Sequence, residues 1–225
     1  MPAKAKPDEQ RKFYEETLKP LIDKAHKECD KHILLFLDAS HFVMGCDFLG
    51  SIYGKVRRYV TTFSGRQRYN VLGAINILTK KVTVVTNDTY ITATEICTML
   101  KKVASEYAGK VIHIALDNAR YQKCDTVRDL ANELGIELVY IPPYSPNLNL
   151  IERLWKLVKG KLRSKYYSDF SLFKSTIDSI IAGTETTYKD QVAKLIGEKV
   201  QLYDDLVPLC ENTFIKESTQ KQAVA

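Results

Sequence analysis

The sequence predicts an α/β fold, in which a mixed five-stranded sheet carries helices on both faces. Two short, continuous apolar runs, 33–37 and 111–116, have the pattern of strands that are buried on both sides. Segments of helical periodicity alternate with the later strands, which gives the order β-β-β-α-β-α-β-α after a leading helix. That order is typical of a mixed sheet with helices on both faces.

Local patterns justify the individual elements. Thr92 is suited to cap a helix and Gly109 to end it. Thr79-Lys80, between two strand-like runs, predicts a tight hairpin. In chain order we expect a flexible leader at 1–10, a helix at 11–30, a strand at 33–37 ending at Asp38, a β-meander across 43–90 with strands at 69–78 and 81–86, a helix at 92–107, a strand at 111–116, a helix at 122–134, a strand at 136–141, and helices at 148–166, 170–181 and 187–202.

Composition is that of a globular protein that does not enter a membrane. The 225 residues are 45% hydrophobic and 27% charged, with a net charge of +6 that suits a polyanionic partner. No apolar run approaches the roughly 18–20 residues that span a bilayer, and the polar N-terminus has no secretion signal. Five widely spaced cysteines argue against a zinc site or a disulfide framework. We therefore expect a reducing, cytoplasmic setting.

The stretch 141–156 is the most informative part of the chain. Three prolines interrupt regular structure, and an amphipathic helix follows, with Trp155 in its apolar stripe and therefore assigned to the core. Glu152 lies in the first turn of this helix, and three cations share its side: Lys156, Lys159 and Arg163. The pattern favours a carboxylate aimed by a rigid loop beside phosphate-binding cations. A surface helix with an ordinary Glu152–Lys156 pair is the alternative.

Two further acids, Asp38 and Asp117, each end an apolar strand. If they meet Glu152, the repulsion among three carboxylates requires a cation between them. Oxygen ligands favour Mg²⁺ or Mn²⁺, and two such ions can activate a hydroxyl and stabilise a leaving oxygen on phosphorus. Taken singly, each aspartate is explained more simply as a turn or helix cap, whereas the three acids together favour the metal site.

The stretches 36–40, 116–120 and 142–155 resemble the three signature blocks of DDE transposases of the mariner-like subgroup, including its bacterial insertion-sequence relatives. The 34 residues between Asp117 and Glu152 match the spacing of that subgroup. The resemblance covers about residues 30–168. It implies a ribonuclease-H-like fold and a DNA transposase that depends on Mg²⁺ or Mn²⁺, with two ions bound. Such an enzyme nicks element ends with water and then joins the freed 3′-hydroxyl to target DNA, commonly at a TA dinucleotide.

Carried over by position, Asp38, Asp117 and Glu152 are the expected catalytic residues and metal ligands. Asn118 and Asn149 match positions that shape the site, although both also suit turns. His41 is a candidate DNA contact or, more simply, a partly buried structural histidine. The resemblance divides the chain into a leader with an N-terminal helix (1–30), a catalytic domain (31–168) and a C-terminal helical extension (169–225).

Double-stranded DNA is the expected partner, held mainly through backbone charge. Each candidate cation is also explained as a solvated surface residue. The candidate DNA contacts are Arg57, Arg58, Arg66, Arg68, Arg120, Tyr144, Lys156, Lys159 and Arg163.

One departure from the family pattern concerns end recognition. Family members carry an N-terminal helix-turn-helix part, and the roughly 30 residues before the first block show no such motif. The sequence therefore suggests a catalytic half with a separately encoded helix-turn-helix partner, or a truncated remnant. The family also implies a homodimer. The rival functions are a nuclease or resolvase of the same fold, and a non-catalytic, domesticated DNA-binding relative.

Overall fold

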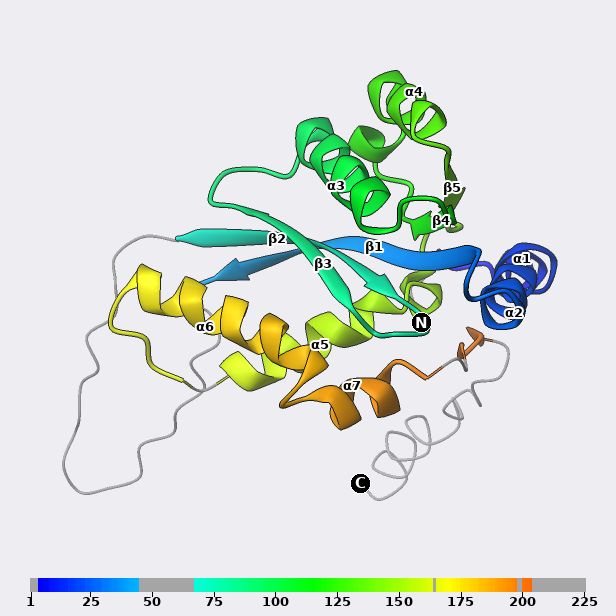
Figure 1. Ribbon diagram of the computed structural model, residues 1–225. Helices are drawn as coiled ribbons and strands as arrows, with labels where there is room; N and C mark the ends of the chain where they lie inside the picture. The colour runs from blue at the N-terminus through cyan, green and yellow to red at the C-terminus, as the bar shows by residue number, and fades with distance from the viewer. Residues whose placement is uncertain (1–3, 45–66, 164, 198–199, 204–225) are drawn as a thin grey trace, which may run out of the picture.

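Five strands form one mixed sheet in the order β3-β2-β1-β4-β5 (Figure 1). The computed structural model describes residues 4–44, 67–163, 165–197 and 200–203. β1 pairs antiparallel with β2 and parallel with β4, and the two outer pairs continue these directions. The predicted fold class is confirmed. The strands are β1 (His32–Val43), β2 (Arg68–Asn76), β3 (Val82–Asn87), β4 (Val111–Leu116) and β5 (Ile136–Tyr140).

β1 is longer than predicted. The expected strand ended at Asp38, but β1 continues to Val43 because β2 pairs with it from Leu35 to its end at Val43. Only the first half of β1, through Leu37, also pairs with β4. The apolar run 33–37 is the part of β1 that lies between two neighbouring strands and is buried on both faces. The more polar residues after it pair with β2 alone, so the apolar pattern did not predict that they continue the strand.

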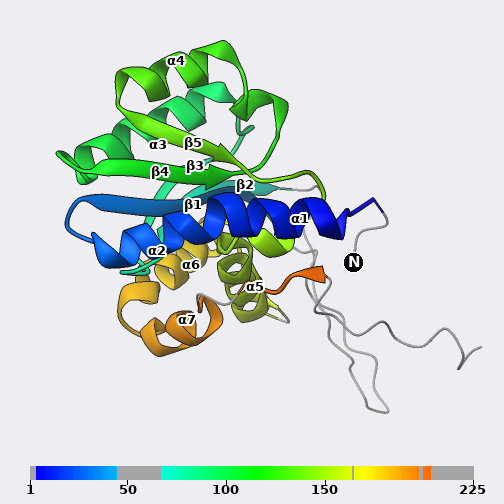
Figure 2. The ribbon, with the colours of Figure 1, turned by 90° about the vertical axis from the view of Figure 1, so that its right-hand side faces the viewer.

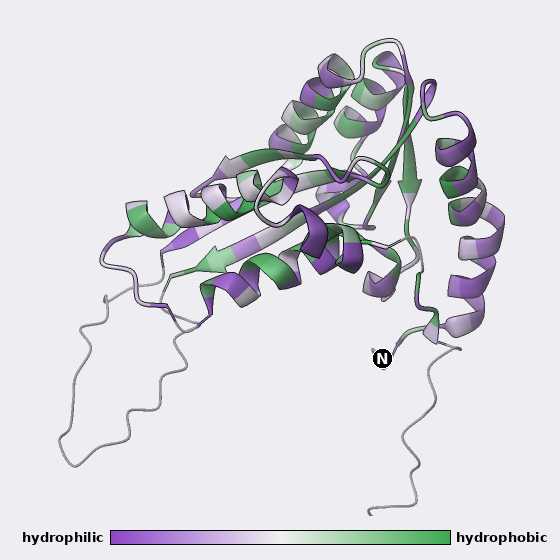
Figure 3. Cartoon of the chain, turned by 60° about the horizontal axis from the view of Figure 1, so that its bottom comes forward, coloured by the Kyte–Doolittle hydropathy of each residue, from purple (hydrophilic) through white to green (hydrophobic). Residues whose placement is uncertain are grey.

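Helices cover both faces of the sheet (Figures 1 and 2). Each face has its own hydrophobic core. On one face, Leu35 and Leu37 pack with the apolar sides of α3 (Ala93–Glu106) and α4 (Asp125–Glu133). On the other face, Leu34 and Phe36 pack with four helical segments. These segments are the N-terminal helices, α5 (Ile151–Leu162), α6 (Phe170–Ala182) and α7 (Lys189–Leu195). Figure 3 shows hydrophilic residues on the outer sides of the helices and hydrophobic ones turned inward.

The N-terminal helical segment begins earlier than predicted. It consists of α1 (Pro7–Phe13), a π-helical turn (η1, Tyr14–Leu18) and α2 (Lys19–Lys27). The expectation of a flexible leader over 1–10 is wrong from Pro7 onward, because Gln10 is fully buried against the rest of the molecule. Pro20 lacks an N–H and would clash with a carbonyl one turn earlier, and the π-helical turn directly precedes it.

Several other predicted elements are shorter than their sequence patterns. The helix predicted at 122–134 starts at Asp125, after a 3₁₀ turn (η2, Arg120–Gln122). α5 starts at Ile151 rather than at 148, because the preceding residues form another 3₁₀ turn (η3, Pro146–Leu148). A third 3₁₀ turn (η4, Gly183–Glu185) leads into α7, which ends at Leu195 rather than at 202. None of the helices in the described ranges has the length and apolar character needed to cross a bilayer.

Candidate active site

The sheet brings the two predicted aspartates to the same place. Asp38 lies in β1 opposite Gly73 of β2. On the other side of β1, the parallel ladder with β4 ends at the pair Leu37–Leu116. Asp117 directly follows β4 and therefore lies beside Asp38, where the parallel pairing stops.

The third acid, Glu152, lies in α5 and is positioned by the Pro-rich loop that precedes this helix. Tyr144 has a φ of 59°, a left-handed conformation that non-glycine residues rarely adopt, and it turns the chain between β5 and η3. Asn118 fixes the start of this loop, since its side-chain amide donates a hydrogen bond to the carbonyl of Ile141. The backbone N–H of Glu152 bonds to the carbonyl of Asn149 at 3.1 Å, which places Glu152 in the first turn of α5.

Burial raises the pKa values of all three acids, and repulsion between carboxylates adds to the rise for Asp38 and Glu152. Burial, followed by the charges of Glu152 and then Asp117, raises the pKa of Asp38 to about 8. Burial raises the pKa of Asp117. Burial and the charge of Asp117 raise the pKa of Glu152, while Lys159 and Lys156 oppose that rise. The three carboxylates are therefore close enough to act on one another, in surroundings that disfavour their charged forms.

Asn149 connects the two aspartates. Its side-chain amide lies 3.1 Å from the carbonyl of Leu37, the residue before Asp38. The same side chain is hydrogen bonded to Asp117, which lowers the pKa of that acid. Asn149 is 1% exposed, and its Oδ1 has no hydrogen-bond partner among the described residues. The structure thus places Asn149 against both strands that carry the aspartates.

Two aromatic residues near the acids were not assigned to the site from sequence. Trp155 is buried in the core as predicted, but its indole Nε1 also donates a hydrogen bond of 3.1 Å to Oδ2 of Asp38. Tyr121 of η2 lies close enough that, after burial, the charges of Asp38 and Asp117 raise its pKa. The sequence did contain a clue that Trp155 belongs to the site: it lies three residues after Glu152, which is less than one helical turn from the third acid.

The donor chemistry of the three acids suits a hard divalent cation. Three carboxylates supply only oxygen ligands, and a positive charge among them would offset the repulsion that helps to raise the pKa values of Asp38 and Glu152. The unpartnered Oδ1 of Asn149 adds a further polar oxygen at this place. Across the described ranges, however, no three His, Cys, Asp or Glu side chains are arranged as a ready-made metal site. The residues fit such an ion by type, and their side chains would have to close around it.

The predicted DNA contacts fall into four groups, of which Arg68 forms the last by itself. Arg57, Arg58 and Arg66 lie outside the described residues. Near the acids, exposed Arg120 follows Asp117 in η2, and Tyr144 is 52% exposed at the turn of the Pro-rich loop. A hollow of about 320 Å³ lies between Asp117 and this loop. On α5 and just beyond it, the exposed cations are Lys156, Lys159 and Arg163.

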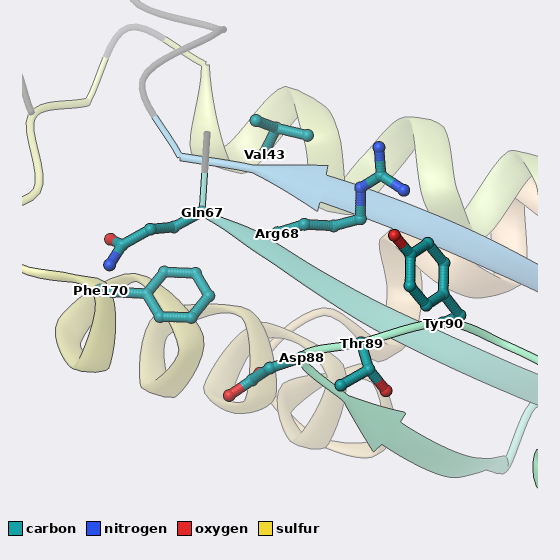
Figure 4. Close-up of a pocket in the computed structure, with 7 residues that line it drawn as sticks. All are labelled: Val43, Gln67, Arg68, Asp88, Thr89, Tyr90 and Phe170. Carbon is teal, nitrogen blue, oxygen red and sulfur yellow. The ribbon is translucent and has the colours of Figure 1, made fainter. Parts of the chain in front are cut away.

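Arg68 and His41 lie farther along the strands. Arg68 pairs with Val43, five positions from Asp38 and therefore about 17 Å away along β1. It lines a hollow of about 570 Å³, where Figure 4 shows it on the side of Tyr90, away from Phe170. His41 is exposed, and its Nδ1 lies 2.6 Å from Oδ1 of buried Asn70. The expectation of a partly buried histidine is therefore wrong. The residues around the hollow are Val43, Gln67, Arg68, Asp88, Thr89, Tyr90 and Phe170.

The sequence matches a known family over most of its length. The family model of the DDE superfamily endonucleases covers residues 33–174, which include all three acids. The chain therefore belongs to the DDE superfamily endonucleases, as the resemblance implied. No curated protein matches it.

Solved structures of a mariner transposase share the fold. The catalytic domain of Mos1 mariner transposase aligns with a TM-score of 0.58 at 14% identity, over 87% of this chain and 92% of that one. A pre-cleavage Mos1 transpososome gives 0.60 at 14% identity, over 87% and 62%. A Mos1 paired-end complex with Mn gives 0.58 at 15% identity, over 87% and 62%. The chain thus has the ribonuclease-H-like fold of this catalytic domain, and it spans less than two thirds of the chains in those two complexes.

Proposed function

We propose that this chain is the catalytic domain of a mariner-like DDE transposase, which nicks the ends of a DNA element by hydrolysis and joins the freed 3′-hydroxyl to target DNA. The observation that carries the proposal is the convergence of Asp38, Asp117 and Glu152, all within the family-matched range, from two neighbouring strands and one helix. This catalytic part corresponds to residues 31–168, with helical additions on both sides.

The acids divide the work by their positions. Asp38 and Asp117 would hold a cation from the sheet, and Glu152 would complete its ligands from α5. When bound, Mg²⁺ or Mn²⁺, as a pair of ions, would supply the charge that lets a hydroxyl attack an anionic phosphodiester. Asn149 would keep the two strands in register at this place through its bonds to Leu37 and Asp117. Asn118 would hold the Pro-rich loop against β4.

DNA would approach along the face that carries Glu152. Lys156 and Lys159 are exposed on the same helix, and both act on the pKa of Glu152, so they lie near it. Tyr144 lines the hollow beside Asp117, and exposed Arg120 directly follows Ala119, another residue of its lining. Backbone phosphates near the acids would therefore meet cations from two sides.

The whole assembly would be larger than this chain. The Mos1 structures that share the fold include a paired-end complex with the left transposon end, which supports two protomers acting on two DNA ends. We propose that this chain acts as a homodimer on double-stranded DNA. Recognition of the end sequences would fall to a helix-turn-helix part supplied separately.

A nicking and joining assay tests the proposed function. The full chain is incubated with supercoiled plasmid, and separately with a labelled duplex that exposes a 3′-hydroxyl, with Mg²⁺, with Mn²⁺ and with EDTA. Nicking and joining that require the cation are expected from the parent. Asp117→Asn should abolish both while the circular dichroism spectrum stays unchanged.

The assay includes a control variant, and specific results would contradict the proposed transposase activity. Asp125→Asn removes an exposed acid from α4 and should act like the parent. Nicking without joining would identify a nuclease or resolvase instead. Absence of cation-dependent nicking in the parent, or full activity of Asp117→Asn, would overturn the proposal.

A further inference from the structure

The indole of Trp155 forms an unusual contact for a core residue. Trp155 is 2% exposed, so its N–H is removed from water and needs a partner inside the protein. That partner is Oδ2 of Asp38 at 3.1 Å. A buried tryptophan thus uses its only donor on the first of the three acids.

Gly73 makes this contact possible. It lies directly opposite Asp38 in the antiparallel ladder of β1 and β2. A Cβ at position 73 would lie 2.7 Å from Cη2 and 2.8 Å from Cζ2 of Trp155, both too close for any real side chain. The indole therefore occupies the space that a side chain at position 73 would fill, and from there its N–H reaches across to β1.

Phe42 holds the ring from another side. The centroids of Phe42 and Trp155 are 6.3 Å apart, and their planes meet at 79°, an edge-to-face arrangement. Phe42 lies four residues after Asp38 in the same strand. The indole is thus packed by one residue of β1 and one of β2, and its orientation follows from this packing.

We propose that Trp155 is a positioning residue that fixes the orientation of the Asp38 carboxylate, and that Gly73 provides the space it needs. The inference rests on the proposed function, since it assigns Asp38 to the reaction. Because Glu152 and Trp155 are three residues apart on α5, one helix carries the third acid and also holds the first. The placement of Glu152 relative to Asp38 is thereby set by a direct contact between α5 and the sheet.

A purely structural role for Trp155 makes a different prediction. If the ring only fills the core, phenylalanine should replace it at a modest cost in stability and leave Asp38 unaffected. If the N–H matters, Trp155→Phe should release the carboxylate even though the core stays filled. Gly73→Ala should have the same effect from a different strand, by displacing the ring.

The bond can be measured without DNA or metal, because Trp155 is the only tryptophan in the chain. A ¹⁵N-labelled full-length parent should give one indole N–H resonance with slow hydrogen exchange. In Asp38→Ala that resonance should shift, and its exchange should accelerate by at least tenfold. An indole resonance that is identical in the parent and in Asp38→Ala would show that the bond is absent and would overturn the proposal.

The consequence for the site is tested by titration and kinetics. Mg²⁺ affinity of the full chain is measured by calorimetry without DNA, and nicking is measured at saturating DNA. Trp155→Phe should weaken Mg²⁺ binding and reduce the maximal nicking rate by roughly tenfold or more, as loss of a hydrogen bond to a charged group implies. Its KM for DNA should be unchanged.

A second core variant separates positioning from general destabilisation. Phe173→Leu alters a buried aromatic residue of the same core on α6, where its ring partners are Tyr167 and Phe170. It should lower the melting temperature but leave Mg²⁺ affinity unchanged. If Trp155→Phe matches Phe173→Leu in every readout, Trp155 only fills the core. If the parent keeps the indole bond and binds Mg²⁺ but never nicks DNA, the proposed function fails instead.

Discussion

Asp38 shows how burial and charge combine at a single residue. It lies inside a strand, between two paired neighbours, and it is only partly exposed. Burial comes first among the causes that raise its pKa to about 8, and the two other acids add to the effect. In the metal-free chain this carboxyl therefore destabilises the fold whenever it is ionised.

Stability of the metal-free chain is expected to fall as the pH rises between about 4 and 8. The folded chain binds the Asp38 proton more tightly than the unfolded chain, so each rise in pH within that window favours unfolding. Asp38→Asn removes the penalty and should be more stable than the parent at pH 8 by a few kcal/mol, since a tenfold change in proton affinity is worth about 1.4 kcal/mol. At pH 4 the two should be alike.

Urea unfolding in EDTA across this pH range measures the effect. Asp129→Asn, which replaces another exposed acid, on α4, serves as the control and should follow the parent at every pH. A parent whose stability is flat from pH 4 to pH 8 would contradict the account of Asp38.

At the level of the element, the Pro-rich loop is held by a buried amide pair. The side chains of Gln10 in α1 and Asn147 in η3 bond reciprocally, at 3.2 Å and 3.1 Å. Gln10 also donates to the hydroxyl of Ser145 at 2.8 Å, and Asn147 donates to the carbonyl of Gln201 at 2.7 Å. The two ends of the described chain thus meet at the loop that delivers Glu152.

Gln10→Ala should loosen that loop. Removing the fully buried amide leaves polar groups of Ser145 and Asn147 without their partner, at a cost of about 1–3 kcal/mol in the free energy of unfolding. Hydrogen exchange of the backbone between residues 144 and 150 should accelerate. Gln191→Ala, on the exposed side of α7, is the matched control. Unchanged exchange in the loop would show that α1 does not hold it.

The cations of α5 should contribute to DNA binding. The double variant Lys159→Glu with Arg163→Glu should weaken binding and flatten the dependence of affinity on salt, because fewer counterions are then released from the DNA. Lys101→Glu with Lys19→Glu makes the same change of charge on α3 and α2 and serves as the control. Fluorescence anisotropy at several salt concentrations measures both. Equal losses in the two double variants would point to net charge rather than to this face.

At the scale of the whole molecule, a bound cation should stabilise the fold. A ligand that binds only the folded state raises stability by about 2.7 kcal/mol at one hundred times its dissociation constant, which is a rise in melting temperature of roughly 5 °C or more for a chain of this size. Mg²⁺ should produce such a rise in the parent and little or none in Asp117→Asn. Differential scanning calorimetry distinguishes the two, and equal rises would place the cation elsewhere.

Sequence patterns predicted which helices and strands exist better than they predicted the residues at which these elements begin and end. Apolar runs predicted β1 and β4 because parallel strands are buried on both faces, whereas the antiparallel arm beyond Asp38 carries polar residues and left no such signal. Pro7 to Gln10 looked like a leader because the burial of Gln10 depends on Ser145 and Asn147, which are far away in sequence. Contacts of this kind arise only when the chain has folded.

The three acids of the candidate site were predictable because their signals are local in the sequence and do not depend on long-range contacts. The acids stand in short stretches with their own local patterns, so the resemblance to a family could be read from those stretches alone. The link from Trp155 to Asp38 could not, because it depends on Gly73, whose missing side chain matters only once β1, β2 and α5 are packed together.

The fit between Trp155 and Gly73 also bears on loop length. The indole ring occupies the space that a side chain at position 73 would fill, so α5 cannot shift along β2 without losing the packing of Trp155 against Gly73. The position of Glu152 is then fixed by the packing of α5 against β2, and not by the number of residues in the loop that precedes the helix. Chains of this architecture can accordingly gain or lose residues between the second and third acids and still present the glutamate at the same point, as long as the glycine and the tryptophan stay together.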